Sequence, residues 1–285
     1  MEPLIHRISA WDGLQLHIRE WSGDLSKPPI LCLPGLVRTG GDFDQLVTHL
    51  PGHHRVIAID YAGRGDSDTA RNVSRYAPEA CARDVIDICA ALHVHGALLI
   101  GTSFGGLLAM GLASIAPSLI SGVILNDIGP DVAPQGRGFV KDFVACDPAL
   151  PSRDACVRHL QRVLPPLSLE TDAAWQRMVS LTYRQGDDGL FHPLWDIRIA
   201  QTLDAPPPDL WPLWRSLAQV PVMLVWGQAS TLLLAGTVER MRQDRPDLVV
   251  VSLPGIGHAP SLTEPDALRA IQGFVGTWAE TRRGH

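Results

Sequence analysis

Short, nearly unbroken apolar runs recur along the chain, each bounded by polar residues or glycine. Two alternating segments come first, at 3–9 and 14–21, and the Asp12-Gly13 pair between them is a strong hairpin signal. Short apolar runs with few polar positions are typical of strands buried on both faces, as in a parallel sheet. Such runs lie at residues 30–33, 55–59, 97–100, 122–125, 221–226 and 248–253. The pattern therefore predicts a mainly parallel, eight-stranded sheet.

Patterns with helical spacing lie between several of these runs. Pro78 suits the first position of a helix, and apolar residues then recur at intervals of three and four as far as Leu92. Residues 104–115 predict a second helix, and Pro265 begins a third, whose apolar face ends at Trp278. Strands that alternate with helices through short connections indicate an α/β, doubly wound fold with helices on both faces of the sheet. In such folds ligands bind at the carboxyl edge of the sheet.

Residues 130–213 interrupt this alternation. The segment contains several helix-compatible pieces, no clear strand, the pair Pro165-Pro166 and three of the eight tryptophans, with a fourth, Trp214, directly after it. A structureless loop of this length is improbable inside a compact domain. We therefore expect a helical cap or lid at 130–213, inserted into a core domain formed by residues 1–129 and 214–285.

Length and composition exclude several classes of protein. A chain of 285 residues, of which 46% are hydrophobic and 19% charged, can bury one large core and is not disordered. The net charge of −6 comes without a basic run, which argues against nucleic acid or an anionic membrane as a partner. No apolar window approaches the roughly 18 residues that a membrane span needs. Five scattered cysteines are most simply free thiols in a reducing, cytoplasmic location.

A serine lies in a glycine-rich junction between a predicted strand and a predicted helix. It is Ser103, in the segment 101–105 (Gly-Thr-Ser-Phe-Gly) directly after the apolar run 97–100. A tight turn of this kind strains the serine and lifts its hydroxyl out of the sheet edge, and only glycine fits beside it. The helix that follows directs its N-terminal amides at the same point, which favours a developing negative charge. The alternative is a turn that contains serine by chance, and the position between strand and helix favours a nucleophile.

With these residues the chain resembles the α/β-hydrolase fold superfamily, and three further segments agree. Residues 33–36 (Leu-Pro-Gly-Leu) are similar to the family's oxyanion loop. Residues 60–67 (Asp-Tyr-Ala-Gly-Arg-Gly-Asp-Ser) are similar to its D-x-x-G-x-G-x-S turn, and residues 255–260 (Gly-Ile-Gly-His-Ala-Pro) to its histidine loop. The resemblance implies that the backbone amides of Leu36 and Phe104 are the two donors that an acyl-transfer transition state requires.

Among eleven histidines, His258 is the candidate general base. A serine hydroxyl is a poor nucleophile until a base takes its proton, and imidazole is suited to that work. His258 follows the run 248–253 in a glycine-flanked loop, at the same predicted edge of the sheet as Ser103. Seven others lie at predicted helix ends, in solvent loops or in the segment 130–213: His49, His53, His54, His93, His95, His159 and His192.

The carboxylate of a serine–histidine–carboxylate triad is missing from its usual place. Relatives usually carry it just after the seventh strand, where residues 226–233 contain none and Thr231 occupies the expected position. Threonine carries no charge to stabilise an imidazolium, and loss of the carboxylate in a serine protease costs about 10⁴ in kcat. Asp127, after the neighbouring run 122–125, is the candidate replacement because adjacent strands lie about 4.8 Å apart, and Asp131 is a weaker one. Two alternatives stay open: a weakened enzyme without the acid, or an Asp127 that only shapes a turn.

These residues predict two-step acyl transfer through an acyl-enzyme on Ser103. The expected partner is a small to medium hydrophobic ester or lactone; a homodimer is compatible with the sequence. Two alternatives are a carbon–carbon hydrolase acting on a ring-cleavage diketone, which relatives of this architecture include, and a catalytically weak ligand-binding member. Trp175 and Trp195 are candidate substrate-binding residues, unless they serve only to hold the cap together. The chain has neither H-E-x-x-H spacing nor a G-x-x-x-x-G-K loop, so we expect no metal and no cofactor.

Overall fold

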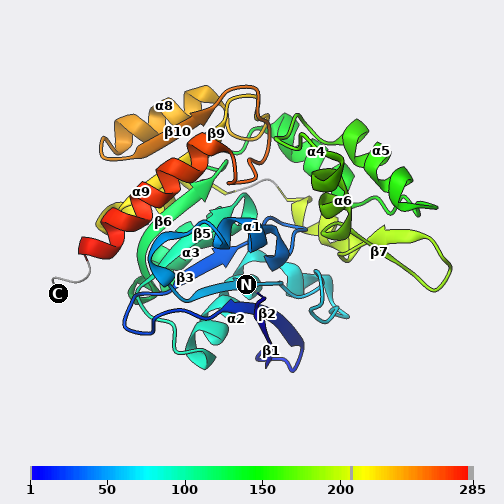
Figure 1. Cartoon of the computed structure of the whole chain (residues 1–285), viewed down its shortest axis with the longest axis horizontal. Coiled ribbons are helices and arrows are strands. Elements are labelled where there is room, and N and C mark those ends of the chain that lie inside the picture. Colours follow the sequence, from blue (N-terminus) through cyan, green and yellow to red (C-terminus); the bar gives the residue numbers. More distant parts are fainter. Residues whose placement is uncertain (1, 206–207, 282–285) are drawn as a thin grey trace.

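A sheet of eight strands forms the centre of the molecule (Figure 1). The computed structural model describes residues 2–205 and 208–281. The strands are β1 (Leu4–Ser9), β2 (Gln15–Trp21), β3 (Ile30–Leu33), β4 (Val56–Ile59), β5 (Ala97–Thr102), β6 (Ile120–Asn126), β9 (Val222–Gly227) and β10 (Val249–Leu253). They follow the order β1-β2-β4-β3-β5-β6-β9-β10, in which β2 is antiparallel to both its neighbours and every other pair is parallel. The predicted sheet is confirmed.

Helices cover both faces of this sheet. They are α1 (Asp44–Val47), α2 (Pro78–Ala91), α3 (Phe104–Ile115), α4 (Pro134–Val144), α5 (Arg153–Val163), α6 (Asp172–Ser180), α7 (Trp211–Arg215), α8 (Ala235–Asp244) and α9 (Pro265–Thr281). α2 and α3 share one apolar core with the sheet, whereas α9 contributes to a second core. The three predicted helices are confirmed as α2, α3 and α9. The apolar pattern does not predict α8, because only Val238 and Met241 of this helix are buried.

β3 shows why the parallel strands are apolar throughout. Ile30 and Cys32 belong to the core shared with α9, whereas Leu31 and Leu33 belong to the core shared with α2 and α3. All four side chains are therefore buried. Burial of an aliphatic side chain is worth about 1.5–3 kcal/mol, so polar residues are disfavoured until a strand ends. Functional polar groups accordingly collect at the carboxyl edge of the sheet.

The described residues of the segment 130–213 add no strand to the large sheet. They contain α4, α5, α6 and a hairpin of β7 (Tyr183–Gln185) and β8 (Phe191–Pro193), which gather at one side of the molecule (Figure 1). The hairpin differs from the expectation of helices alone, because strands this short give no period-two signal. α5, α6 and the hairpin share a small apolar core. The division of the chain at 130 and 213 stays a prediction; α7 crosses the latter, and residues 206–207 lie outside the described residues.

The sequence also predicted that the chain has no membrane span and that its cysteines are free thiols. Across residues 2–205 and 208–281, every helix is too short or too polar to cross a membrane. All five cysteines are free, and Cys146 alone is exposed. Burial raises the pKa of Cys89 to about 12, so this thiol stays protonated and unreactive at neutral pH.

The first turn of α3 approaches β3 so closely that only glycine fits there. A Cβ on Gly105 would lie 2.0 Å from the carbonyl oxygen of Leu33, and one on Gly101 would lie 2.6 Å from the Gly105 backbone. Both neighbours are backbone atoms, which cannot rotate out of the way. A Cβ on Gly111, in the same helix, would meet nothing within 4 Å.

We predict that Gly105→Ala lowers the free energy of unfolding by about 3 kcal/mol or prevents folding, because overpacking against backbone is not relieved by a rotamer change. Gly111→Ala is the matched control and should raise stability by about 0.5–1 kcal/mol through helix propensity. Urea unfolding followed by far-UV circular dichroism measures both. Equal midpoints for Gly105→Ala and the unsubstituted chain would contradict the close approach.

Candidate active site

Ser103 occupies the turn between β5 and α3. Its φ of 51° and ψ of −115° lie outside the regions that residues with a side chain prefer, and such a conformation costs roughly 1–3 kcal/mol. The close approach of α3 to β3 imposes the turn, and the Ser103 amide donates to the carbonyl of Asn126 at 3.0 Å. The sequence-based expectation of a strained serine at this junction is therefore met in the backbone geometry.

His258 lies in the loop between β10 and α9 and contacts two side chains that are more than 100 residues away from it in the sequence. Its Nε2 lies 2.9 Å from Ser103 Oγ, and its Nδ1 lies 2.8 Å from Asp127 Oδ2. One tautomer satisfies both contacts: Nδ1–H donates to the carboxylate, and the serine hydroxyl donates to Nε2. Asn126 Nδ2 holds the loop by donating to the carbonyl of Pro260 at 2.9 Å. The three side chains form one hydrogen-bonded row.

Asp127 follows β6 and is completely buried. Its Oδ1 accepts a hydrogen bond from the Gly227 amide at 2.9 Å, which leaves Oδ2 for His258. Its own amide donates to the carbonyl of Val225 at 2.8 Å. The carboxylate is thus held from the ends of β6 and β9. Asp127 therefore has both contacts that the sequence raised for it: it fixes the turn at this edge of the sheet, and it contacts the imidazole of His258.

Thr231 lies on the surface and makes no hydrogen bond to His258. The turn after β9 is instead organised by Ser230, whose Oγ accepts from the amides of Leu232 and Leu233 at 3.2 Å each. Asp131 accepts from Trp211 Nε1 at 2.9 Å and does not reach the histidine. Among the three residues weighed for the acid position, Asp127 is the one that contacts the imidazole.

Two backbone amides near Ser103 are available to a ligand. They belong to Leu36, in the loop after β3, and Phe104, the first residue of α3. Within the ranges 2–205 and 208–281 neither amide donates a hydrogen bond. The peptide that carries the Leu36 amide is oriented by Arg38, whose amide donates to the carbonyl of Gly35 at 3.1 Å. Unpartnered amides beside a serine can stabilise an oxyanion.

A cavity of about 230 Å³ opens over Ser103 and His258. Its wall is mainly apolar, and the segment 130–213 supplies much of it. Those side chains are Phe139, Phe143, Leu160, Leu164, Met178 and Leu181. Sequence reasoning missed Phe139 and Phe143, which lie one helical turn apart on α4, because an apolar stripe on a helix usually marks a core-facing side.

Trp175 and Trp195 do not line this cavity. Trp195 is buried in the core, and its Nε1 donates to the carbonyl of Val144 at 2.9 Å. Trp175 packs against the small core of the segment 130–213. An indole needs both an apolar site and an acceptor for its N–H, and the interior of this segment supplies both for Trp195. The contacts of both tryptophans are thus structural, and a role for either in substrate binding stays a prediction that this cavity does not support.

The cavity wall also carries cationic side chains. Arg38 is neutralised by Asp42, to which it donates at 2.8 and 2.6 Å, and it also donates to Thr182 Oγ1 at 2.7 Å. Arg177, on α6, lines the same cavity and makes no hydrogen bond or ion pair within the described part of the chain. Its guanidinium is thus exposed and unpaired, with Asp44 within electrostatic reach of it.

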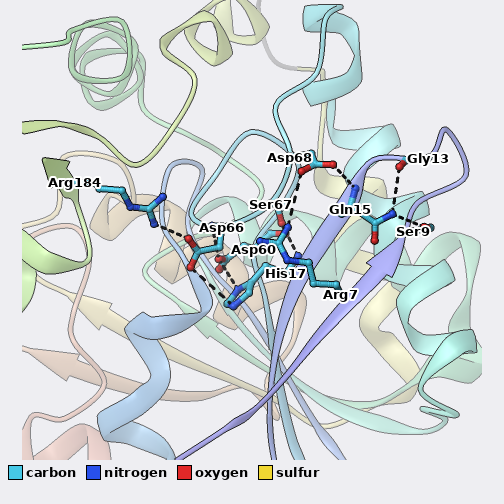
Figure 2. A network of polar contacts seen from close by, with 10 residues as sticks. All are labelled: Arg7, Ser9, Gly13, Gln15, His17, Asp60, Asp66, Ser67, Asp68 and Arg184. Carbon is cyan, nitrogen blue, oxygen red and sulfur yellow. Dashed lines mark hydrogen bonds and ion pairs between the residues drawn. The ribbon is translucent and has the colours of Figure 1, made fainter. Parts of the chain in front are cut away.

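One group of potential metal ligands lies on β2 and the turn after β4. His17, Asp60 and Asp66 offer atoms within 4.8 Å of one another. Asp60 is already engaged, however, because its Oδ1 accepts from the Gly40 amide at 2.7 Å and its Oδ2 accepts from the Asp66 amide at 3.2 Å. Its Oδ2 also lies 2.9 Å from His17 Nδ1 (Figure 2). These contacts fix the turn and need no ion.

Comparison with known proteins places these observations in a family. The model of the alpha/beta hydrolase fold matches residues 28–265. A 3-hydroxybutyrate-oligomer hydrolase of Cupriavidus necator is 32% identical over 269 residues, which are 90% of this chain and 92% of that protein. A 2-(acetamidomethylene)succinate hydrolase of Mesorhizobium japonicum is 28% identical over 264 residues, 92% of each chain. The solved structure of an alpha/beta hydrolase from Novosphingobium aromaticivorans superimposes with a TM-score of 0.90 at 36% identity and covers 96% of this chain and 98% of its own.

The family match includes the segment 130–213, and the superposition covers 96% of the chain. The strand order, in which β2 alone runs antiparallel to the other strands of the sheet, and the strained serine after β5 agree with it. The resemblance inferred from four short segments is confirmed: the chain belongs to the alpha/beta hydrolase fold family.

Proposed function

We propose that this chain is a serine hydrolase that cleaves a carboxylic ester or lactone of a small to medium hydrophobic substrate through an acyl-enzyme on Ser103. Membership of the family supports hydrolysis, and the ester bond is our proposal. The observation that carries it is the continuous row from Ser103 through His258 to the buried carboxylate of Asp127. A serine, an imidazole and a carboxylate in this order produce a nucleophile at neutral pH.

In the first step Ser103 Oγ attacks the substrate carbonyl while its proton moves to His258 Nε2 at 2.9 Å. The imidazolium that forms is stabilised by Asp127, which also holds the ring in the tautomer that can accept the proton. The negative charge that develops on the carbonyl oxygen would be stabilised by the free amides of Leu36 and Phe104. His258 then protonates the leaving alcohol, and the acyl group stays on Ser103.

In the second step a water molecule attacks the acyl-enzyme. His258 Nε2 takes a proton from this water and returns it to Ser103 Oγ as the ester bond breaks. The apolar wall of the cavity limits the number of water molecules near the acyl group. The acid is released, and the resting row of hydrogen bonds is restored.

The sequence also raised two alternative functions, a ligand-binding protein and a carbon–carbon hydrolase. A catalytically weak, ligand-binding protein was suggested by the missing carboxylate, and the contact between Asp127 and His258 removes that motive. A carbon–carbon hydrolase acting on a ring-cleavage diketone can use the same row, so the site geometry does not favour either bond. The relatives support hydrolysis without deciding which bond is cleaved, and the ester stays our proposal.

The cavity also suggests a chemical class for the substrate. Its volume of about 230 Å³ lies below the roughly 300–1,000 Å³ of pockets for drug-sized ligands, which favours a small molecule. Arg177 places an unpaired positive charge on its wall. The names of the two relatives both denote acids, a 3-hydroxybutyrate oligomer and a substituted succinate. We therefore propose an ester that carries a carboxylate, which Arg177 binds.

The central experiment is labelling with a fluorophosphonate probe together with hydrolysis of p-nitrophenyl butyrate. We expect the unsubstituted chain to be labelled and active, and Ser103→Ala to lose both properties, because the probe reacts only with an activated serine. Ser180→Ala, at an exposed position on α6, is the control and should behave like the unsubstituted chain. Labelling of Ser103→Ala to the same extent would exclude Ser103 as the nucleophile.

A second prediction concerns the acid. Asp127→Asn should lower kcat by about 10⁴, as expected when the histidine loses the carboxylate that fixes its tautomer. Asp131→Asn is the matched control and should change kcat by less than about twofold, because its carboxylate contacts Trp211 and Arg240 and does not reach His258. Thr231→Asp should not raise kcat, since position 231 is exposed and Asp127 already occupies Nδ1. A large gain with Thr231→Asp would show instead that the acid has been lost.

A third prediction tests the carboxylate. The 3-hydroxybutyrate dimer ends in a carboxylate, which its methyl ester replaces with an uncharged ester group. Arg177→Met should raise KM for the dimer about tenfold, which corresponds to about 1.4 kcal/mol, and should leave KM for the methyl ester unchanged. Arg158→Met, an exposed change on α5 outside the cavity lining, should affect neither. Equal effects of Arg177→Met on both esters would rule out recognition of the charge.

A further inference from the structure

Arg64 is a completely buried cation that forms no direct ion pair within the described part of the chain, although Asp196 lies within electrostatic reach of it. It lies in the turn at 60–67, after β4. Its Nε donates to the carbonyl of Leu36 at 2.8 Å and its Nη1 to the carbonyl of Ala62 at 2.7 Å. Its Nη2 is buried and has no partner in the described part of the chain. Two neutral carbonyls therefore accept its hydrogen bonds, and the thiol of Cys81 lies beside the guanidinium.

Such a charge is expensive to bury. Burial lowers the pKa of Arg64, yet a guanidinium remains protonated at neutral pH. Three aromatic rings compensate in part, since the guanidinium carbon lies 5.7 Å from the ring centre of Tyr61, 5.4 Å from that of Tyr76 and 6.0 Å from that of Phe104. Rings do not replace a carboxylate, and an apolar side chain would fill the space at lower cost. The presence of a buried arginine at this position therefore requires a structural or functional explanation.

The contacts of the Arg64 guanidinium suggest this explanation. It bonds to Leu36 and packs on the ring of Phe104, the two residues whose amides face the proposed oxyanion. Tyr61 completes the contact: its ring meets that of Phe104 edge to face, with centres 5.5 Å apart at 85°. Arg64 and Tyr61 form one buried support beneath both donors.

The support acts on consecutive carbonyl groups of the oxyanion loop. The carbonyl of Pro34 accepts from the Tyr61 hydroxyl at 3.3 Å, and that of Leu36 accepts from Arg64. The carbonyl of Gly35, between them, accepts from the Arg38 amide. Three successive peptide groups are therefore fixed through their oxygens. The Leu36 amide is held in place while its own hydrogen stays free for a ligand.

The turn that carries Arg64 is itself rigid. Gly63 and Gly65, on either side, have φ values of 75° and 60°, and a Cβ on Gly65 would lie 2.2 Å from Asp60 Oδ2. Ser67 Oγ donates to the carbonyl of Asp60 at 2.7 Å and accepts from the His17 amide at 2.8 Å. Figure 2 shows this network tying the turn to β2. Because the turn is rigid, Arg64 can hold the oxyanion loop at Leu36 in a fixed position.

We propose that Arg64 is the positioning residue of the oxyanion hole: it holds Leu36 and Phe104 so that their free amides converge, and its buried positive charge favours a negative oxygen in front of them. This inference rests on the proposed function of Ser103. Arg64 does not touch the substrate and acts through the two donor residues. Its loss should therefore weaken transition-state stabilisation and leave ground-state binding nearly unchanged.

The test compares Arg64→Met, which removes the charge and the bond to Leu36, with Arg64→Lys, which keeps the charge but loses the planar fork. On p-nitrophenyl butyrate, Arg64→Met should lower kcat by about 10²–10³, as does loss of an oxyanion donor in other serine hydrolases. Arg64→Lys should lower kcat by about tenfold. KM should change by less than about threefold in both.

Inhibitor binding separates positioning from general damage. An alkyl trifluoromethyl ketone forms a tetrahedral adduct with the serine, whereas the matching methyl ketone binds without one. We expect the affinity for the trifluoromethyl ketone to fall in parallel with kcat/KM in both Arg64 variants, and the affinity for the methyl ketone to stay constant.

Arg75→Met is the matched control for loss of a buried arginine. Arg75 is paired with Asp12 and Asp84 at 2.7 Å each and contacts neither donor residue. Its substitution should lower the urea midpoint while leaving kcat of the folded protein within about twofold. If Arg64→Met does not fold, Arg64→Lys decides. Unchanged kcat and trifluoromethyl ketone affinity in folded Arg64→Lys would overturn the inference, whereas an unsubstituted chain without esterase activity or labelling would overturn the proposed function instead.

Discussion

The site depends on how closely the first turn of α3 approaches the end of β3. The absence of side chains at Gly101 and Gly105 lets the helix reach the backbone of Leu33. This contact strains Ser103 and brings the oxyanion loop at Leu36 to the start of α3. Nucleophile and candidate donors are thus set by one backbone contact, before any polar side chain takes part. Strain at such a turn persists only because packing around it determines the backbone fully.

Two buried charges lie around this turn and are held in different ways. Asp127 is an anion that accepts from the Gly227 amide and contacts an imidazole, so both of its oxygens are satisfied. Arg64 is a cation that donates to carbonyls and faces aromatic rings, and one of its nitrogens stays unsatisfied. In the proposed mechanism the first charge stabilises a cation on His258, and the second favours an anion on the substrate. Together they match the charge separation of the transition state.

The histidine loop is also joined to the segment 130–213. The Gly257 amide donates to the carbonyl of Pro166 at 2.6 Å, and Ser168 donates to Glu264, which also accepts from the Ser261 amide. The residues that cover the cavity are therefore hydrogen-bonded to the loop that carries His258. Because the two are tied, the apolar wall and the imidazole are positioned together over Ser103.

Local backbone constraints can be recognised in the sequence, and the elements that depend on them were predicted correctly. The strands, the helices α2, α3 and α9, and the turn at Ser103 each follow from a few neighbouring residues whose apolar spacing or glycines permit one conformation. The solvent-facing α8 and the three-residue strands β7 and β8 carry too little apolar pattern to be predicted. The contacts of Asp127, Thr231, Trp175 and Trp195 depend on which distant residues become neighbours. Asp127 and His258 are 131 residues apart, and only the order of the strands, with β6 beside β9, brings this carboxylate to the imidazole. Sequence alone therefore determined where polar chemistry could occur, whereas tertiary packing decided which side chains meet, because side-chain contacts are set by the sheet order and not by spacing along the chain.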